Sequence, residues 1–247
     1  MKVLIISLLL VASLACIEGI RNGEPWLEAP YMARIQYSTP AGQGGGVIFS
    51  QRHILTSGFV VNPTFTAFTA WVGSTSRGSQ RMVAVQTRLR HPNYQLTPRL
   101  NDIGIVTLTA DLVFDDFVWP IRLPIMNQIL PYDNQQGTAL GFGGVPGGVQ
   151  PSEQLQAAFL RISPPTACNT RFPQHTIAQQ FCGEDSRLRS EVCNDDLGGP
   201  FIVLDRGREV LVGLISDHFC IAAQPSQPAL FTRVSAFRAW INQMTLV

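Results

Sequence analysis

Charged residues are scarce in this 247-residue chain. They make up 14% of the sequence, and the formal net charge is +1. A chain without an excess of one sign has no long-range field that would draw it to nucleic acid or to a membrane surface, so neither partner is expected. Lysine is almost absent, because Lys2 is the only one and every other cation is an arginine.

Several of these arginines lie close together in the sequence, and two interpretations of them stay open. Arg88 and Arg90 alternate along one segment and would share a face of a strand. Such a face would either bind a polyanion such as heparin or pair with Asp and Glu at a solvated surface, and we favour the second interpretation. The arginines concerned are Arg77, Arg81, Arg88, Arg90, Arg99, Arg206 and Arg208.

Patterns that hold metals or sugars are missing. The chain has five cysteines and four histidines, without a Cys-x-x-Cys or His-x-x-x-His spacing, so neither a metal site nor a cofactor is expected. It has no Asn-x-Ser/Thr sequon in which x is a residue other than proline, so N-glycosylation is not expected either. If Cys16 is removed with an N-terminal signal, the remaining four cysteines allow three pairings.

Long apolar runs are limited to the N-terminus. Lys2 precedes the apolar stretch Val3–Leu14, which is too short to span a bilayer comfortably and is typical of a secretory signal peptide. We therefore predict a signal peptide over residues 1–19, cleaved after Ala15 or Gly19, and a secreted protein without a membrane span. Secretion would allow disulfides to form.

Short segments rich in Val, Ile, Thr and Phe fill the rest of the chain, punctuated by 21 glycines and 17 prolines. This pattern predicts an all-β fold of the sandwich or barrel type. Asp205-Arg206-Gly207 reads as a hairpin loop, and residues 143–151 as a flexible Gly/Pro-rich segment. One helix is predicted at 235–245, capped by Ser235 and with an apolar face. That face comprises Phe237, Trp240, Ile241 and Met244.

Five spaced motifs, in this order, resemble the chymotrypsin-like (S1) serine protease family. They are Ile20-Arg21-Asn22-Gly23, Gly45-Gly46 with Ile54-Leu55-Thr56, His91-Pro92-Asn93-Tyr94 with Asn101-Asp102-Ile103, Cys193 with Asp196-Leu197-Gly198-Gly199-Pro200, and Phe231-Thr232-Arg233-Val234 leading into Trp240-Ile241. The resemblance covers residues 20–247 and is strongest to secreted arthropod members. It implies two six-stranded antiparallel β-barrels, at about 31–125 and 133–234, followed by the terminal helix.

The resemblance also implies the disulfide pairing. The family has disulfides at the positions of Cys168–Cys182 and Cys193–Cys220. A third family disulfide, beside the base histidine, is missing here, since its two positions hold Gly44 and Val60.

The residues that the family uses for chemistry are replaced. Peptide hydrolysis of this type needs an attacking hydroxyl, an imidazole base and a carboxylate that orients the base. The base position holds Phe59 and the nucleophile position holds Leu197, so only the carboxylate of Asp102 remains. The oxyanion position that is normally glycine holds Asp195, whose Cβ and negative charge both oppose the oxyanion, while the second amide belongs to Leu197. His218 is the one histidine near the expected cleft, and we interpret it as a rim residue rather than a replacement base.

The resemblance places five further residues around a specificity pocket: Glu191 at its base, and Ser216, Asp217, His218 and Ala229 along its wall. A buried Glu191 would need a partner, which would be either a basic ligand side chain or a local arginine such as Arg187 or Arg189. If the chain is cut before Ile20, the new ammonium group would pair with Asp196.

We therefore expect a secreted serine protease homologue without catalytic activity that binds another secreted protein. The partner would be a protease, a protease substrate or an inhibitor, and the role that of a cofactor or decoy in a protease cascade of immunity or haemostasis. Two alternatives stay open: a serine-type endopeptidase with a rebuilt active site, and a polyanion-binding or antimicrobial module.

Overall fold

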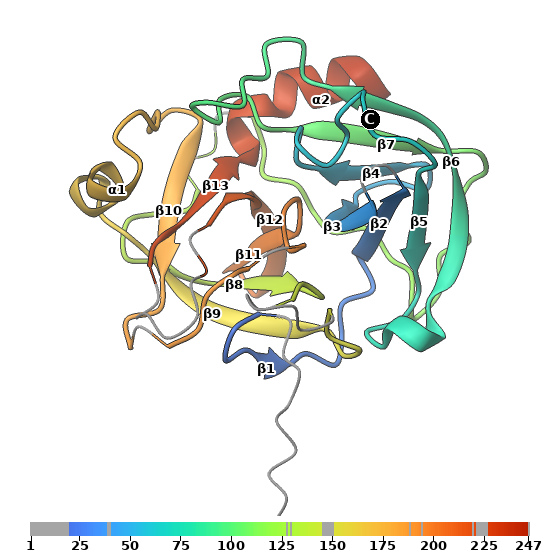
Figure 1. Ribbon diagram of the computed structural model, residues 1–247, viewed down its shortest axis with the longest axis horizontal. Coiled ribbons are helices and arrows are strands. Elements are labelled where there is room, and N and C mark those ends of the chain that lie inside the picture. Colours follow the sequence, from blue (N-terminus) through green and yellow to red (C-terminus); the bar gives the residue numbers. More distant parts are fainter. Residues whose placement is uncertain are drawn as a thin grey trace, which may run out of the picture.

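The computed structural model describes residues 20–38, 41–126, 128, 130–144, 151–187, 189–193, 195–218, 220 and 227–246. The predicted signal peptide lies outside these residues, as does most of the Gly/Pro-rich segment. Figure 1 shows the described strands in two groups that stand side by side, with the C-terminal helix lying across the top.

The first group forms a closed barrel in the order β2-β3-β4-β7-β6-β5, antiparallel throughout. Strands β2, β3, β4 and β7 are mostly buried, whereas β6 carries only exposed and partly exposed residues. Their bounds are β2 Met32–Ser38, β3 Ala41–Ile48, β4 His53–Thr56, β5 Thr69–Val72, β6 Arg81–Arg90 and β7 Gly104–Leu108.

The second group is also a closed six-stranded barrel. Its strands follow the order β9-β10-β13-β12-β11-β8, and antiparallel pairing of β8 with β9 closes the ring, while the short strand β1 is added beside β9. Two antiparallel barrels with a C-terminal helix confirm the predicted fold class. The bounds are β1 Glu24–Pro25, β8 Gln136–Gly141, β9 Gln156–Ile162, β10 Gln180–Glu184, β11 Pro200–Asp205, β12 Arg208–Asp217 and β13 Ala229–Arg233.

The predicted hairpin loop joins β11 to β12. Arg206 and Gly207 have φ angles of 52° and 73°, both in the left-handed region. Two consecutive positive φ values are the conformation that matches the twist of a two-residue hairpin, and Gly207 adopts it without steric cost.

The helices are short. A 3-10 turn covers Arg77–Ser79, helix α1 covers Pro165–Arg171, and the C-terminal helix is divided into a 3-10 turn at Val234–Phe237 and α2 at Arg238–Thr245. The prediction that Ser235 caps the terminal helix is therefore wrong. Ser235 lies buried inside the 3-10 turn, and α2 begins after Phe237 without a side-chain cap. Tight 3-10 turns are common where a helix begins, and this one brings Val234 and Phe237 into the core.

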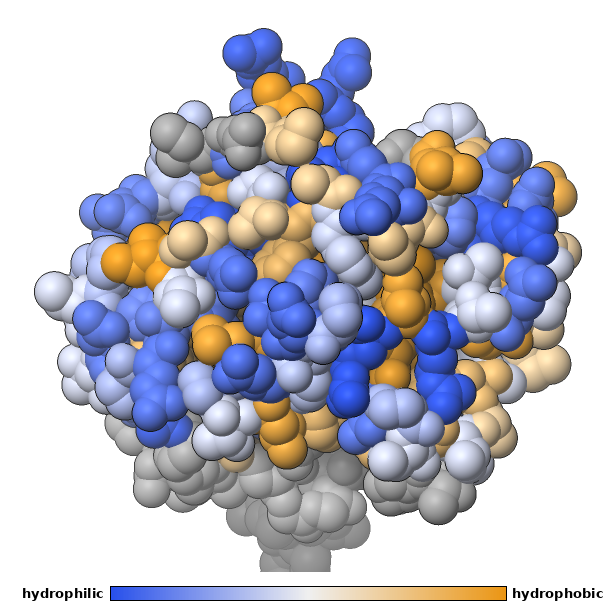
Figure 2. Space-filling model, turned by 90° about the horizontal axis from the view of Figure 1, so that it is seen from above, coloured by the Kyte–Doolittle hydropathy of each residue, from blue (hydrophilic) through white to orange (hydrophobic). Residues whose placement is uncertain are grey.

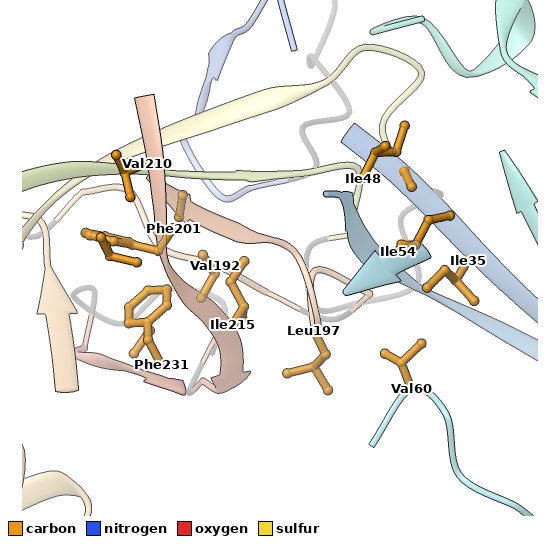
Figure 3. Close-up of a cluster of buried hydrophobic side chains, with 14 of the residues drawn as sticks. Ile35, Ile48, Ile54, Val60, Val192, Leu197, Phe201, Val210, Ile215 and Phe231 are labelled. Atoms are coloured by element: carbon orange, nitrogen blue, oxygen red, sulfur yellow. The ribbon is translucent and has the colours of Figure 1, made fainter. Parts of the chain in front are cut away.

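The largest cluster of buried side chains draws on both barrels. Figure 3 shows Ile35 and Val60 from the first barrel on one side, Phe201 and Phe231 from the second on the other, and Leu197 between them. Large apolar side chains do reach the surface, but the face seen from above in Figure 2 shows them as small patches among hydrophilic residues.

Candidate functional site

A phenyl ring stands where the resemblance puts the general base. Phe59 follows strand β4 in a turn, and its ring packs edge-on against Phe65 at 5.9 Å between ring centres. The alignment behind this position is supported by its neighbours, because a Cβ atom on Gly44 would collide with the side chain of Val60. These two positions are therefore in contact, as the two halves of a lost disulfide must be. A phenyl ring accepts no proton, so no base stands here.

Asp102 is buried, and its carboxylate is fully engaged. Oδ1 accepts the backbone N–H of Phe59 at 2.9 Å, and Oδ2 accepts the hydroxyl of Ser216 at 2.6 Å. Burial raises the pKa of Asp102, while the Ser216 hydrogen bond, the nearby Arg99 and the Phe59 amide act to lower it. These contacts agree with a structural role, since the carboxylate ties the turn at Phe59 to strand β12. The Ser216 hydroxyl is itself inaccessible, because Ser216 is 0% exposed.

Arg99 completes this group, and sequence reasoning assigned it only to a basic stretch. Its guanidinium carbon lies 4.7 Å from the centre of the Phe59 ring, a cation–π arrangement. Nη1 donates to the carbonyl of Ser216 at 2.6 Å and lies 3.9 Å from Oδ2 of Asp102. Nε lies 3.6 Å from Asp217. Arg99 therefore balances the charge of Asp102, and it covers the ring that replaces the histidine.

Leu197 belongs to the core that joins the two barrels, and 9% of it is exposed. Its backbone is held as well, because its carbonyl accepts the N–H of Gly45 at 2.8 Å. A buried isobutyl group forms no bond to a substrate, and burying it stabilises the fold by roughly 2 kcal/mol. The nucleophile position has thus become a packing position.

Asp195 adopts a backbone conformation that favours glycine, with φ at 69°. Its side chain lines a hollow of about 450 Å³ together with Tyr37 and Arg77. Burial raises the pKa of the Asp195 carboxyl, and Arg77 lowers it. A carboxylate at this position opposes the negative charge that acyl transfer develops.

The predicted pocket residues differ in exposure. Ser216, Ala229 and Glu191 are buried, whereas Asp217 and His218 are partly exposed. Residues 221–226 lie outside the described part of the chain. Burial raises the pKa of Glu191 to about 7, and the charge of Arg21 acts to lower it.

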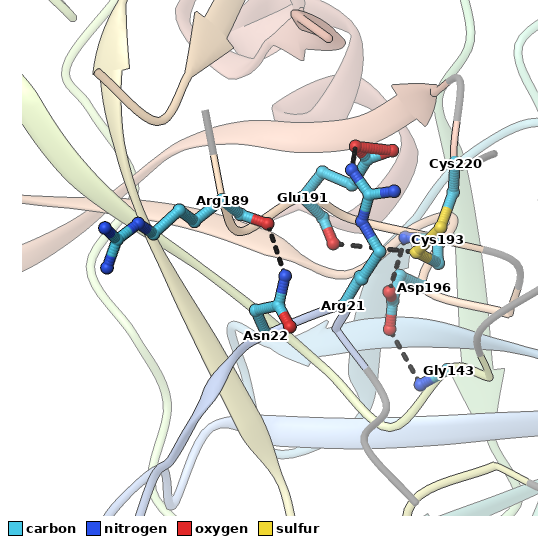
Figure 4. The surroundings of a disulfide bond; sticks show 8 residues. All are labelled: Arg21, Asn22, Gly143, Arg189, Glu191, Cys193, Asp196 and Cys220. Carbon is cyan, nitrogen blue, oxygen red and sulfur yellow. Dashed lines mark hydrogen bonds and ion pairs between the residues drawn. A yellow bond between two sulfur atoms is a disulfide. The ribbon is translucent and has the colours of Figure 1, made fainter. Parts of the chain in front are cut away.

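The partner of Glu191 is not one of the arginines that the sequence suggested. Arg187 and Arg189 are exposed, and the ion pair is made by Arg21, whose guanidinium contacts the Glu191 carboxylate (Figure 4). The expectation of Arg187 or Arg189 fails because these two side chains point to the surface from the loop before Glu191. Arg21 instead reaches the carboxylate from the N-terminal segment that lies alongside it.

Asp196 is completely buried, and each of its oxygens accepts a backbone N–H. These bonds come from Gly143 at 2.7 Å and Cys193 at 2.8 Å. Burial raises the pKa of Asp196 to about 7. Ile20 is also fully buried. In the intact chain its nitrogen is an amide, so the pair between an Ile20 ammonium group and Asp196 stays a prediction for a chain cut at that point.

Both disulfides implied by the resemblance are present. Cys168 pairs with Cys182 and Cys193 with Cys220, with Cα–Cα distances of 5.5 and 5.1 Å. The first bond ties α1 to β10, and the second holds Cys193 in the loop that also contains Asp196 (Figure 4).

None of the four histidines hydrogen-bonds to Asp102. His218 lies next to Asp217, and burial lowers its pKa to about 4, so its ring is neutral at pH 7. Ser50 and His53 do form a hydroxyl–imidazole contact of 2.9 Å. The Ser50 hydroxyl also accepts the amides of Arg52 and His53, which is the bonding of a turn at the start of β4.

Most of the crowded arginines make local contacts. Arg88 stacks on Phe68 and donates to the carbonyls of Pro63 and Phe65. Arg90 stacks on Tyr94. Arg77 and Arg81 pair with Glu153 and Asp115. Arg206 and Arg208 are exposed at the hairpin tip.

Among the described residues, no group of His, Cys, Asp and Glu side chains is arranged to hold a metal ion. No helix among them is long and apolar enough to cross a membrane.

Two antiparallel barrels, with Phe59 and Asp102 from the first and Leu197 from the second at their junction, define the class of chymotrypsin-like serine protease folds. The family model described as Trypsin matches residues 20–241. The chain therefore belongs to the trypsin family of serine proteases.

Known relatives agree with this assignment. The trypsin of Phaedon cochleariae is 28% identical over 213 residues, covering 81% of this chain and 78% of the relative. The serine protease Hayan of Drosophila melanogaster is 30% identical over 237 residues, which cover 86% of this chain but only 36% of that protein. In fold, the chain is similar to the solved structure of HL collagenase, with a TM-score of 0.80 at 23% identity over 92% of this chain and 99% of the other.

Proposed function

We propose that this chain is a secreted member of the trypsin family that does not cleave peptide bonds and acts by binding another secreted protein. One observation carries the proposal. At the junction of the barrels, Leu197 is part of the hydrophobic core and Phe59 replaces the base, while Asp102 is occupied by its own chain. Proton transfer and bond formation have no groups to perform them there.

The scaffold around this junction is complete. Both barrels close, both disulfides form and the core runs through the two halves. A packed fold that lacks catalytic groups is suited to binding a partner protein, because loops on rigid barrels can bind that partner without reacting with it. We propose a role as cofactor or decoy in a protease cascade of immunity or haemostasis, and membership of the trypsin family supports this proposal.

The proposal is tested with the secreted protein and its native fluid. Affinity capture should identify a protease, a protease substrate or an inhibitor, and the purified partner should bind the purified chain directly. The chain should then change the rate at which the relevant protease cleaves its substrate, while showing no turnover itself. Turnover that is abolished by replacing one serine would contradict the proposal and would establish the rebuilt endopeptidase instead.

The polyanion alternative is less well supported. The guanidinium groups of Arg88 and Arg90 lie on aromatic rings, and Arg77 and Arg81 are paired with carboxylates. We therefore expect the protein to elute from heparin at low salt. Elution well above the salt concentration that a net charge of +1 requires would favour this alternative.

A further inference from the structure

The N-terminal segment of the described chain is fixed to the second barrel by several contacts. Ile20 is 0% exposed, and the backbones of Arg21 and Glu191 exchange two hydrogen bonds of 3.0 and 3.2 Å. The amide of Asn22 donates to the carbonyl of Arg189 at 2.8 Å, and β1 pairs with β9. The segment 20–25 is therefore seated in the intact chain.

The segment also forms an ion pair with the second barrel, between Arg21 and Glu191, and this pair is shielded from water. The side chain of Arg21 is 13% exposed and that of Glu191 is 4% exposed, and their charged groups are in contact. Figure 4 shows the Arg21 guanidinium directed at the Glu191 carboxylate, whereas the side chain of Arg189 points away from both. Removing one partner of such a pair leaves a charge with little solvent around it, which is strongly unfavourable.

The other buried carboxylate nearby does not hold the segment. Both oxygens of Asp196 accept backbone N–H groups, from Gly143 and Cys193. Of these two buried carboxylates, Glu191 is therefore the one that forms an ion pair with residues 20–25.

We propose that Arg21 is a positioning residue. Its ion pair with Glu191 holds segment 20–25 on the second barrel without cleavage before Ile20, and the same ion pair makes Glu191 unavailable to cationic ligands. Glu191, which the resemblance places at the base of the specificity pocket, is thus paired with a cation of its own chain. This inference is independent of the proposed function, because it concerns how the segment is seated and what the pocket admits.

Hydrogen exchange tests the seating. In R21Q and E191Q, the amides of Arg21, Gly23 and Trp26 should exchange at least about tenfold faster than in the wild type. R189Q is the matched control, because it removes an exposed arginine next to Glu191, and it should leave these rates unchanged. E191Q keeps the shape of the side chain, so it serves if R21Q fails to fold. Unchanged exchange in both variants would overturn the proposal.

Binding of benzamidine, a small amidinium compound, tests the withdrawal of Glu191. Calorimetry should detect no binding to the wild type at millimolar concentration, and a gain of at least about tenfold in affinity for R21A, which uncovers the carboxylate. The double variant R21A/E191Q should lose the binding again. Equal binding by the wild type and R21A, or none by R21A, would show that Arg21 does not control access to Glu191. These readouts do not involve peptide cleavage, so a failure of this inference is distinguishable from a failure of the proposed function.

Discussion

Restoring the two missing reactive groups should not by itself restore an enzyme. We expect the double variant F59H/L197S to remain far less active than the quadruple variant F59H/R99L/D195G/L197S. The reason lies in Arg99 and Asp195, whose charges oppose the charges that develop in peptide hydrolysis of this type. Arg99 covers the base position, and Asp195 brings a carboxylate to the oxyanion position.

The magnitudes follow from the geometry. The guanidinium carbon of Arg99 lies 4.7 Å from the centre of the Phe59 ring, so an imidazolium formed at that position would stand about as far from a like charge. At an effective dielectric constant of about 20, this repulsion amounts to about 3.5 kcal/mol, part of which Asp102 offsets. A carboxylate about 4 to 8 Å from an oxyanion adds about 2 to 4 kcal/mol to the barrier. The double variant should therefore be slower by at least about a hundredfold.

The assay is the kcat/KM for an activated ester together with labelling by a fluorophosphonate, a probe for reactive serines. The variants F59H/R99L/L197S and F59H/D195G/L197S separate the two contributions. Thermal unfolding of each variant checks that the fold is intact. If the double variant hydrolysed the ester as fast as the quadruple variant, the assignment of Arg99 and Asp195 as obstacles would be refuted.

Three further predictions concern stability. D102A should lower the free energy of unfolding by about 3 kcal/mol in a denaturant titration, because the N–H of Phe59 and the hydroxyl of Ser216 lose a charged acceptor. A loss below about 1 kcal/mol would contradict a structural role of the Asp102 carboxylate. Burial raises the folded pKa of Asp196 to about 7, so the Asp196 carboxyl holds a proton in the folded protein between about pH 4 and pH 7 that it has lost in the unfolded chain. The free energy of unfolding of the wild type relative to that of D196N should therefore rise as the pH falls from 8 to 5, by at most about 1.4 kcal/mol per pH unit, and a fall over this range would reject that shift. The free energy of unfolding of the variant C168A/C182A should be about 3 kcal/mol lower than that of the wild type in non-reducing denaturant titrations, because the variant opens a loop with a sequence separation of 14. Equal stability of the two proteins would show that the bond does not constrain the unfolded chain.

Much of the architecture could be predicted from sequence because it depends on local signals and ordered motifs. The alternation of apolar residues, the turn at Arg206-Gly207 and the cysteine positions all lead to features that the structure contains. The terminal helix was predicted as one element, yet it begins with a 3-10 turn, since burial of Val234 and Phe237 outweighs capping by Ser235. Helix α1 was not predicted, although Pro164-Pro165 before Thr166 is a signal for a helix that starts with proline.

The site was predictable where single positions decide the chemistry and unpredictable where distant side chains meet. The flanking motifs alone assigned Phe59 to the base position and Leu197 to the nucleophile position, and these two assignments stay predictions. The pairing of Arg21 with Glu191 joins residues 170 positions apart, and no local pattern in the sequence connects them. Arg99 lies only three positions before Asp102, but its place over Phe59 depends on how the turn after β4 folds against that loop.

The central claim is that the junction of the barrels holds no reactive groups. The most direct test is to label the purified wild-type protein with a fluorophosphonate and to incubate it with a broad peptide library. We predict neither labelling nor cleavage above the level of heat-denatured protein. Stoichiometric labelling of one serine, with cleavage lost when that serine is replaced, would contradict the claim.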